Sequence, residues 1–129
     1  PEEQRAKSVK YMWAMKQLER LNRGDTLPTL VTLTAHGMTL GEGLRLFGME
    51  GEAVGDWGYF VEGLYGGGVT FPMGYTDGQG LYLPTSAMVP EGGYEAVSAW
   101  EYGFPSNLAE GMEEEVRRAV ADLRERGVG

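Results

Sequence analysis

The side chains that could perform acid–base chemistry are few in this chain, and the single histidine is the clearest of them. His36 follows a stretch of alternating apolar and polar residues, 27–35. A histidine at a strand end can serve as a general base, because its pKa lies near neutral pH. No serine stands in a Gly-x-Ser-x-Gly motif that would supply a nucleophile. His36 alone therefore does not predict an active site.

The spacing of the residues also does not predict a metal site or a phosphate-binding loop. With no cysteine and one histidine, a zinc site would have to be completed by carboxylates. Residues 41–43 (Gly-Glu-Gly) place an acid where a phosphate would bind and lack the Gly-Lys-Ser/Thr of a P-loop. Residues 77–80 hold one carboxylate rather than the ligand series of a calcium loop. We therefore expect no catalytic residue, no cofactor and no metal.

Carboxylates lie among aromatic residues in the middle of the chain, a combination that glycosidases also use. In an extended segment, Glu62 would fall on the side opposite Trp57 and Tyr59. We interpret the acids as the solvated face of a sheet whose aromatic face is buried. They are Asp56, Glu62, Asp77, Glu95 and Glu101. On that acidic face, Glu62 and Asp77 are the residues we expect to contact a protein partner.

The net charge of −8 is distributed unevenly along the chain. Residues 1–23 carry +3, residues 24–116 hold fourteen acids against Arg45 alone, and residues 117–129 return to +2. An acidic body repels nucleic-acid phosphates, so we expect no direct nucleic-acid binding. A larger protein with a basic surface is a better electrostatic complement.

Residues 1–24 are rich in helix formers and predict a helix that ends at Gly24. One set of apolar residues has helical spacing and should pack on the sheet: Tyr11, Ala14, Met15, Leu18 and Leu21. Trp13 points the other way, among basic residues. It either covers a second patch of its own domain or belongs to a contact surface, because Trp and Arg are enriched in binding hot spots. The residues of that expected contact surface are Val9, Trp13, Lys16 and Arg20.

The next segment predicts a strand and then a short helix. Residues 27–35 alternate well enough for a half-buried strand. Thr39 and Glu42 match a capping box, which predicts a helix over residues 40–47 that stops at Gly48. Residues 48–55 are a glycine- and acid-rich loop.

The stretch 57–102 places aromatic residues at alternate positions between glycines and prolines, which predicts a sheet. Strands are expected over 57–65, 69–75 and 81–83, with hairpin connections at 66–68 and 75–78, because Gly-Gly and Asp-Gly accept positive φ. Val69, Phe71 and Met73 fall on the expected core face. Residues 94–104 predict a further strand, with a helix beginning near Pro90 as the alternative.

Residues 107–127 predict a C-terminal helix. Asn107 and Glu110 fit a capping box, and Gly127 ends the helix. Its apolar stripe consists of Leu108, Met112, Val116, Ala119, Val120 and Leu123. Three acid-first pairs should stabilise it: Glu113–Arg117, Glu114–Arg118 and Asp122–Arg126.

These elements together predict a single α+β domain over residues 1–129. We expect a mostly antiparallel sheet of four to five strands and one short helix within residues 27–104, flanked by an N-terminal and a C-terminal helix. No apolar run approaches the length of a membrane span, and the lack of cysteine fits a reducing compartment. We therefore expect a cytoplasmic protein with no membrane contact, and the oligomeric state stays open.

Three classes of function fit these patterns. The favoured one is a non-enzymatic regulator or inhibitor that docks on a larger protein, with an RNA polymerase or a nuclease as the kind of partner. A phage-encoded regulator of a host enzyme suits the small size, the charge pattern and the missing chemistry. The alternatives are a small-ligand-binding or hydrolytic enzyme with a pocket in the aromatic sheet, and a structural subunit of a virion or another assembly.

Overall fold

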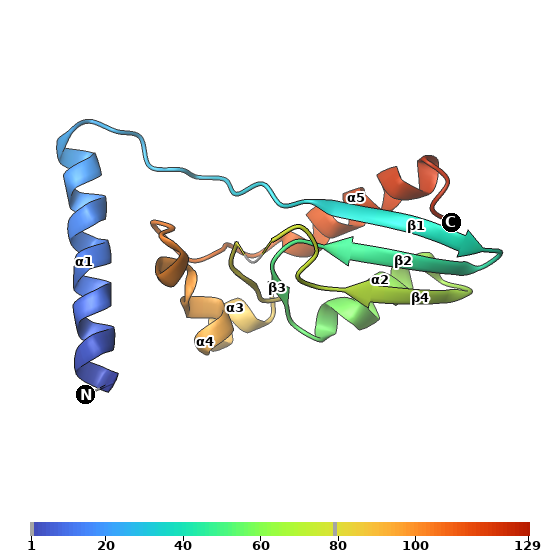
Figure 1. The fold of residues 1–129 in the computed structure, drawn as a ribbon, viewed down its shortest axis with the longest axis horizontal. Coiled ribbons are helices and arrows are strands. Elements are labelled where there is room, and N and C mark those ends of the chain that lie inside the picture. The colour runs from blue at the N-terminus through green and yellow to red at the C-terminus, as the bar shows by residue number, and fades with distance from the viewer. Residues whose placement is uncertain (1, 79) are drawn as a thin grey trace.

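A computed structural model describes residues 2–78 and 80–129, and it shows an α+β arrangement of helices with small sheets. A long helix, α1 (Glu2–Asn22), stands at one end of the molecule, and a three-stranded sheet with its helices lies at the other (Figure 1). This sheet has one antiparallel and one parallel strand pair. It is therefore smaller than expected and mixed rather than mostly antiparallel.

The first two strands of this sheet form a hairpin. β1 (Ala35–Gly41) pairs antiparallel with β2 (Leu44–Met49), and Gly43 makes the turn with φ +70°. The predicted helix over 40–47 is therefore wrong: the residues alternate along strands, and the turn needs the positive φ that glycine supplies. The predicted strand over 27–35 is also wrong, because pairing begins only at Ala35.

A helical crossover leads to the third strand. α2 (Asp56–Tyr65) runs into β4 (Val69–Met73), which lies parallel to β2. The strand predicted over 57–65 is a helix, since Trp57, Val61 and Tyr65 are buried at i, i+4 and i+8. Residues 66–68 consequently join a helix to a strand and do not close a hairpin.

A second, smaller sheet pairs β3 (Glu52–Ala53) with β5 (Tyr82–Leu83) in parallel. The loop predicted over 48–55 therefore contains a short strand. Residues 75–78 were expected to close a hairpin, but β4 and β5 belong to different sheets. The separate prediction that residues 77–80 do not form a calcium loop includes Gln79, which lies outside the described residues.

Short helices replace the strand predicted over 94–104. They are α3 (Met88–Glu91), α4 (Tyr94–Val97) and the 3₁₀ helix η1 (Ala99–Tyr102). The alternative, a helix near Pro90, is nearer to what is observed. Gly92 and Gly93 both have positive φ and separate α3 from α4, which is backbone that a continuous strand or helix does not adopt.

The last helix, α5 (Met112–Glu125), begins later than expected. Gly111 at its start has φ +101°, so residues 107–110 do not continue the helix and the predicted capping box at Asn107 is wrong. Two of the expected ion pairs form, Glu114–Arg118 at 3.7 Å and Asp122–Arg126 at 2.8 Å. Glu113 instead accepts hydrogen bonds from the backbone amide and the hydroxyl of Ser86.

The hydrophobic core lies on one side of the three-stranded sheet, under α2 and α5. α2 packs on β4 and on α5, and α5 contacts β1 (Figure 1). The core residues buried there include Phe47, Trp57, Val61, Leu81, Leu83, Val120 and Leu123. The indole N–H of Trp57 donates to the Leu83 carbonyl at 2.9 Å, which ties α2 to the smaller sheet.

Arg45 is buried on the same side of β2 and closes the end of α2. Its guanidinium donates to the Gly67 carbonyl at 2.7 Å and to the Thr70 hydroxyl at 3.0 Å, and it lies 4.5 Å from the centre of the Tyr65 ring. A cation at a helix C-terminus is favourable because the carbonyl ends of the helix dipole point toward it. Arg45, the only arginine or lysine within residues 24–116, therefore has a structural role.

Candidate protein-docking surface

Within the described residues, the helices that pack on the three-stranded sheet, α2 and α5, lie on one side of it and leave the second side open. Cross-strand partners in register share a face, and the rows Met38–Leu46–Phe71 and Leu44–Val69 fall on this side. We call this surface the open sheet face. Its members are His36, Met38, Leu40, Leu44, Leu46, Gly48, Val69, Phe71 and Met73.

The open sheet face is apolar and accessible. Met38 is 57% exposed and Phe71 is 51% exposed, and Leu40 and Val69 are similarly accessible. Val69, Phe71 and Met73 were predicted to lie in the core, and that prediction is wrong. The buried residue of β4 is instead the polar Thr70. Large contiguous apolar patches on a protein surface mark binding sites for proteins or ligands.

Acidic side chains stand at both ends of the open sheet face. Glu42 lies in the β1–β2 turn, and Glu50 follows the last residue of β2. Beside Glu50, the carboxylate of Asp77 is 2.8 Å from Nδ1 of His36. An apolar centre bordered by charged residues is the usual anatomy of a protein–protein contact.

The His36–Asp77 pair fixes a loop onto the end of this face. Tyr75 and Asp77 both have positive φ, which non-glycine residues rarely adopt. A side chain at Gly48 would lie within 3 Å of the His36 imidazole and the Thr76 hydroxyl, so only glycine fits below the loop. Sequence reasoning named His36 and Asp77 separately, and the structure brings them together. The pair holds the loop in place, and within the described residues the Thr76 hydroxyl beside it has no hydrogen-bond partner.

The α1 residues expected to contact a partner share one side of that helix, at i, i+4, i+7 and i+11. The Trp13 indole N–H donates to the Phe104 carbonyl at 2.8 Å, so this side chain packs on its own chain beside η1. Gln17 is buried and donates to the Gly103 carbonyl at 3.2 Å. Val9 and Lys16 are exposed, and Arg20 is half-buried.

The apolar side of α1 was expected to pack on the sheet, and that prediction is wrong. Tyr11 is 65% exposed, and Met12, Met15, Leu18 and Leu21 are also exposed. We call Tyr11, Met12, Met15 and Leu18 the α1 stripe, because these exposed apolar residues lie within about 120° of one another on the helix. The hydrogen bonds of Trp13 and Gln17 hold the opposite side of the helix, so the α1 stripe points away from the rest of the chain.

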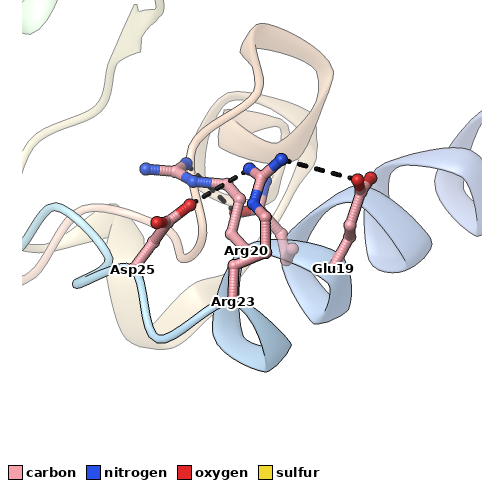
Figure 2. A network of polar contacts seen from close by, with 5 residues as sticks. Glu19, Arg20, Arg23 and Asp25 are labelled. Atoms are coloured by element: carbon pink, nitrogen blue, oxygen red, sulfur yellow. Dashed lines mark hydrogen bonds and ion pairs between the residues drawn. The ribbon is translucent and has the colours of Figure 1, made fainter.

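Ion pairs order the C-terminal end of α1. Figure 2 shows Arg23 between Glu19, at 3.5 Å, and Asp25, at 3.1 Å. Arg20 donates to the Gln17 side chain at 3.4 Å. Exposed ion pairs contribute little stability, so Trp13 and Gln17 are the main anchors of the helix.

Glu62 lies on the exposed side of α2, in the helical layer behind the sheet. Asp77 lies in the loop at the end of the open sheet face. The structure therefore does not bring Glu62 and Asp77 together, nor does it place them beside the α1 residues named above.

Tyrosines and two glutamates gather between the sheets and η1. The Tyr82 ring makes edge contacts with Tyr94, at 5.3 Å, and Tyr102, at 6.3 Å between ring centres. The Glu52 carboxylate accepts a hydrogen bond from Tyr82 and raises the pKa of that hydroxyl well above 10. Glu101 has the same effect on the pKa of Tyr94, whose hydroxyl lies 3.1 Å away.

An apolar groove of about 740 Å³ runs below the extended segment 28–35. The start of α5 and residues 104–109 form its other wall. Glu115 is the one ionisable side chain among its described lining residues. Trp57 and Leu83, from the stretch predicted to form the aromatic sheet, line it as well, and its described lining holds no pair of acid–base groups.

The comparisons with known proteins give no family assignment. No protein-family model, curated protein or solved structure matches this chain. Within residues 2–78 and 80–129, no group of three or more His, Asp or Glu side chains is placed to hold a metal ion. In the same part of the chain, each helix is too short or too polar to cross a bilayer.

Proposed function

We propose that this chain is a non-enzymatic protein-binding protein and that the open sheet face is its docking surface. The observation that carries the proposal is the row Met38–Leu46–Phe71, an apolar row across three strands with two members more than half exposed. Covering such a row removes apolar area from water, which is the main driving force of protein association.

The border of the face indicates the chemistry of the partner. Glu42 at one end and Glu50 at the other favour basic groups around an apolar contact. The proposed partner is therefore a surface with exposed apolar side chains flanked by lysine or arginine. A larger protein with a basic surface, such as an RNA polymerase or a nuclease, has this chemistry, and docking there would make the chain a regulator or inhibitor.

A structural subunit of an assembly is the second candidate. The observation in its favour is α1, which presents the exposed α1 stripe at the end of the molecule remote from the sheet. Two separate apolar surfaces on one chain suit a subunit that contacts more than one neighbour.

Affinity capture with matched variants tests the proposal. Phe71→Glu places a charge on the open sheet face, and Tyr59→Glu places the same charge on the outer side of α2, where Tyr59 is 80% exposed. We expect the wild type and Tyr59→Glu to retain the same partner and Phe71→Glu to lose it. Equal retention by all three would place the binding site elsewhere. Retention should also weaken with added salt if basic groups contribute.

A further inference from the structure

We propose that the open sheet face binds the α1 stripe of a second copy of this chain. This inference rests on the proposed function, because it takes the open sheet face as a protein-docking surface and names its occupant. It follows from four observations: an unpartnered helix face, an unpartnered sheet face, their matching dimensions and their opposite charge.

The α1 stripe is presented by the way α1 is anchored. Trp13 and Gln17 bond to the Phe104 and Gly103 carbonyls through one side of the helix. Successive residues of a helix are rotated by about 100° about its axis, so Met15 and Leu18 point away from the side that carries Trp13 and Gln17. The anchor therefore leaves the α1 stripe open to a neighbour, and no bond has to break before a neighbour can dock.

The two apolar surfaces have similar lengths. From Tyr11 to Leu18 the α1 stripe extends about 10 Å, at about 1.5 Å per helical residue. The β4 edge of the open sheet face, from Val69 to Met73, extends about 13 Å, at about 3.3 Å per residue. One helix can therefore lie over the exposed rows of the sheet and cover both Met38 and Phe71.

The two surfaces also differ in charge. Residues 1–23 carry a net charge of +3, and residues 24–116 carry −13. Lys16 is an exposed base of α1, while Glu42 and Glu50 border the open sheet face. Attraction between a basic helix and an acidic body favours helix-on-sheet docking over contacts between two helices or two sheets, which would each join like charges.

The contact has to be made between two molecules. Figure 1 places α1 and the three-stranded sheet at opposite ends of the chain. Between them, residues 26–33 make no backbone hydrogen bond with the described part of the protein, but the bonds of Trp13 and Gln17 hold α1 beside η1. The α1 stripe therefore cannot reach its own sheet while these bonds persist.

Two variants separate helix-on-sheet docking from other modes of self-association. Leu18→Glu places a charge in the α1 stripe, and Phe71→Glu places one on the open sheet face. Each variant alone should raise the dissociation constant measured by sedimentation velocity by about tenfold or more. Tyr59→Glu is the matched control, and it should sediment as the wild type does.

A mixture of the two variants is the decisive sample. The intact sheet face of Leu18→Glu can accept the intact helix of Phe71→Glu, so the mixture should form a mixed dimer although each variant alone stays monomeric. Circular dichroism of each variant checks its fold, and Met38→Glu repeats the test from β1 if Phe71→Glu unfolds.

Several results would overturn the inference. They are a wild type that remains monomeric at every concentration, either variant alone associating as tightly as the wild type, or a mixture that forms no mixed dimer at a concentration where each variant alone is monomeric. The proposed function fails separately. If the wild type is monomeric but affinity capture still returns a partner that depends on Phe71, the docking surface stands and its occupant is another protein.

Discussion

Replacing Phe71 by alanine tests how much binding free energy the open sheet face supplies. A phenylalanine side chain has about 200 Å² of surface, and Phe71 is 51% exposed, so a partner can cover about 100 Å² of it. At about 25 cal/mol per Å², this area is worth about 2.5 kcal/mol, of which alanine keeps a small part. We therefore expect Phe71→Ala to weaken binding by about 2 kcal/mol, which is roughly thirtyfold in the dissociation constant.

Isothermal titration calorimetry with the protein retained in the capture experiment measures this loss. Tyr59→Ala is the control, because it removes an aromatic ring that is 80% exposed on the outer side of α2, and we expect it to bind as the wild type does. A heat-capacity change of smaller magnitude should accompany Phe71→Ala, since less apolar area is buried. Equal affinity of Phe71→Ala and the wild type would refute the assignment of this face.

The remaining predictions concern stability. Val61 is fully buried, so Val61→Ala should lower the free energy of unfolding, measured by chemical denaturation, by about 2–3 kcal/mol. Val69→Ala on the open sheet face should lower it by less than about 1 kcal/mol. Equal losses in the two variants would contradict the placement of the core. Trp13→Ala removes the bond to the Phe104 carbonyl and should speed limited proteolysis within residues 26–33, with unchanged cleavage arguing against the anchor. Burial alone would raise the Glu113 pKa, but hydrogen bonds from Ser86 lower it below 4.5. The stability that Glu113 contributes above pH 4.5 should therefore be lost as the pH falls through the lowered pKa. Urea titrations at a series of pH values should show a shallower loss of stability in acid for Glu113→Gln than for the wild type. Glu52 raises the Tyr82 pKa, so the stability that Tyr82 contributes is complete below pH 10 and is lost as the pH rises through the raised pKa. Glu52→Gln should therefore shift part of the tyrosinate absorbance to lower pH. An absorbance titration identical to that of the wild type would count against the Tyr82–Glu52 contact.

The sequence predicted the α+β character and the two terminal helices, because these helices have long periodic segments. α1 ends within two residues of the expected position, at Asn22. The alternation of Val69, Phe71 and Met73 also predicted β4 as a strand. What alternation could not supply was the side of the sheet that is buried, since apolar residues occupy the open sheet face as well.

The middle of the chain was mispredicted because its residues fit two periods. Trp57, Tyr59 and Val61 alternate, but Trp57, Phe60, Val61, Leu64 and Tyr65 also follow i, i+3, i+4, i+7 and i+8, which is the pattern the helix uses. Glycine and aromatic residues in the segment disfavour a helix by propensity, and tertiary packing overrides that preference. The parallel pairing of β2 and β4 depends on contacts distant in sequence, so local pattern could not reveal it.

The candidate site was reached only in part from sequence. The basic helix and acidic body were visible as charge segments, and helical spacing separated Trp13 from the apolar side of the helix. Only the Phe104 carbonyl beside it shows that Trp13 packs on its own chain. Leu40, Leu44 and Phe47 fit a helical stripe as well as a strand. The one signal that favoured a hairpin was glycine at positions 41 and 43, at the end of β1 and in the turn itself.

The methionine methyl groups offer the most direct test of the docking surface. Met38 and Met73 lie on the open sheet face, Met12 and Met15 lie on the α1 stripe, and Met112 lines the groove below residues 28–35. Methyl NMR of protein labelled at methionine, recorded over a series of protein concentrations and with the captured partner, should show changes at Met38 and Met73. Self-association should add changes at Met12 and Met15. Changes at Met112, with Met38 and Met73 unaffected, would contradict docking on the open sheet face.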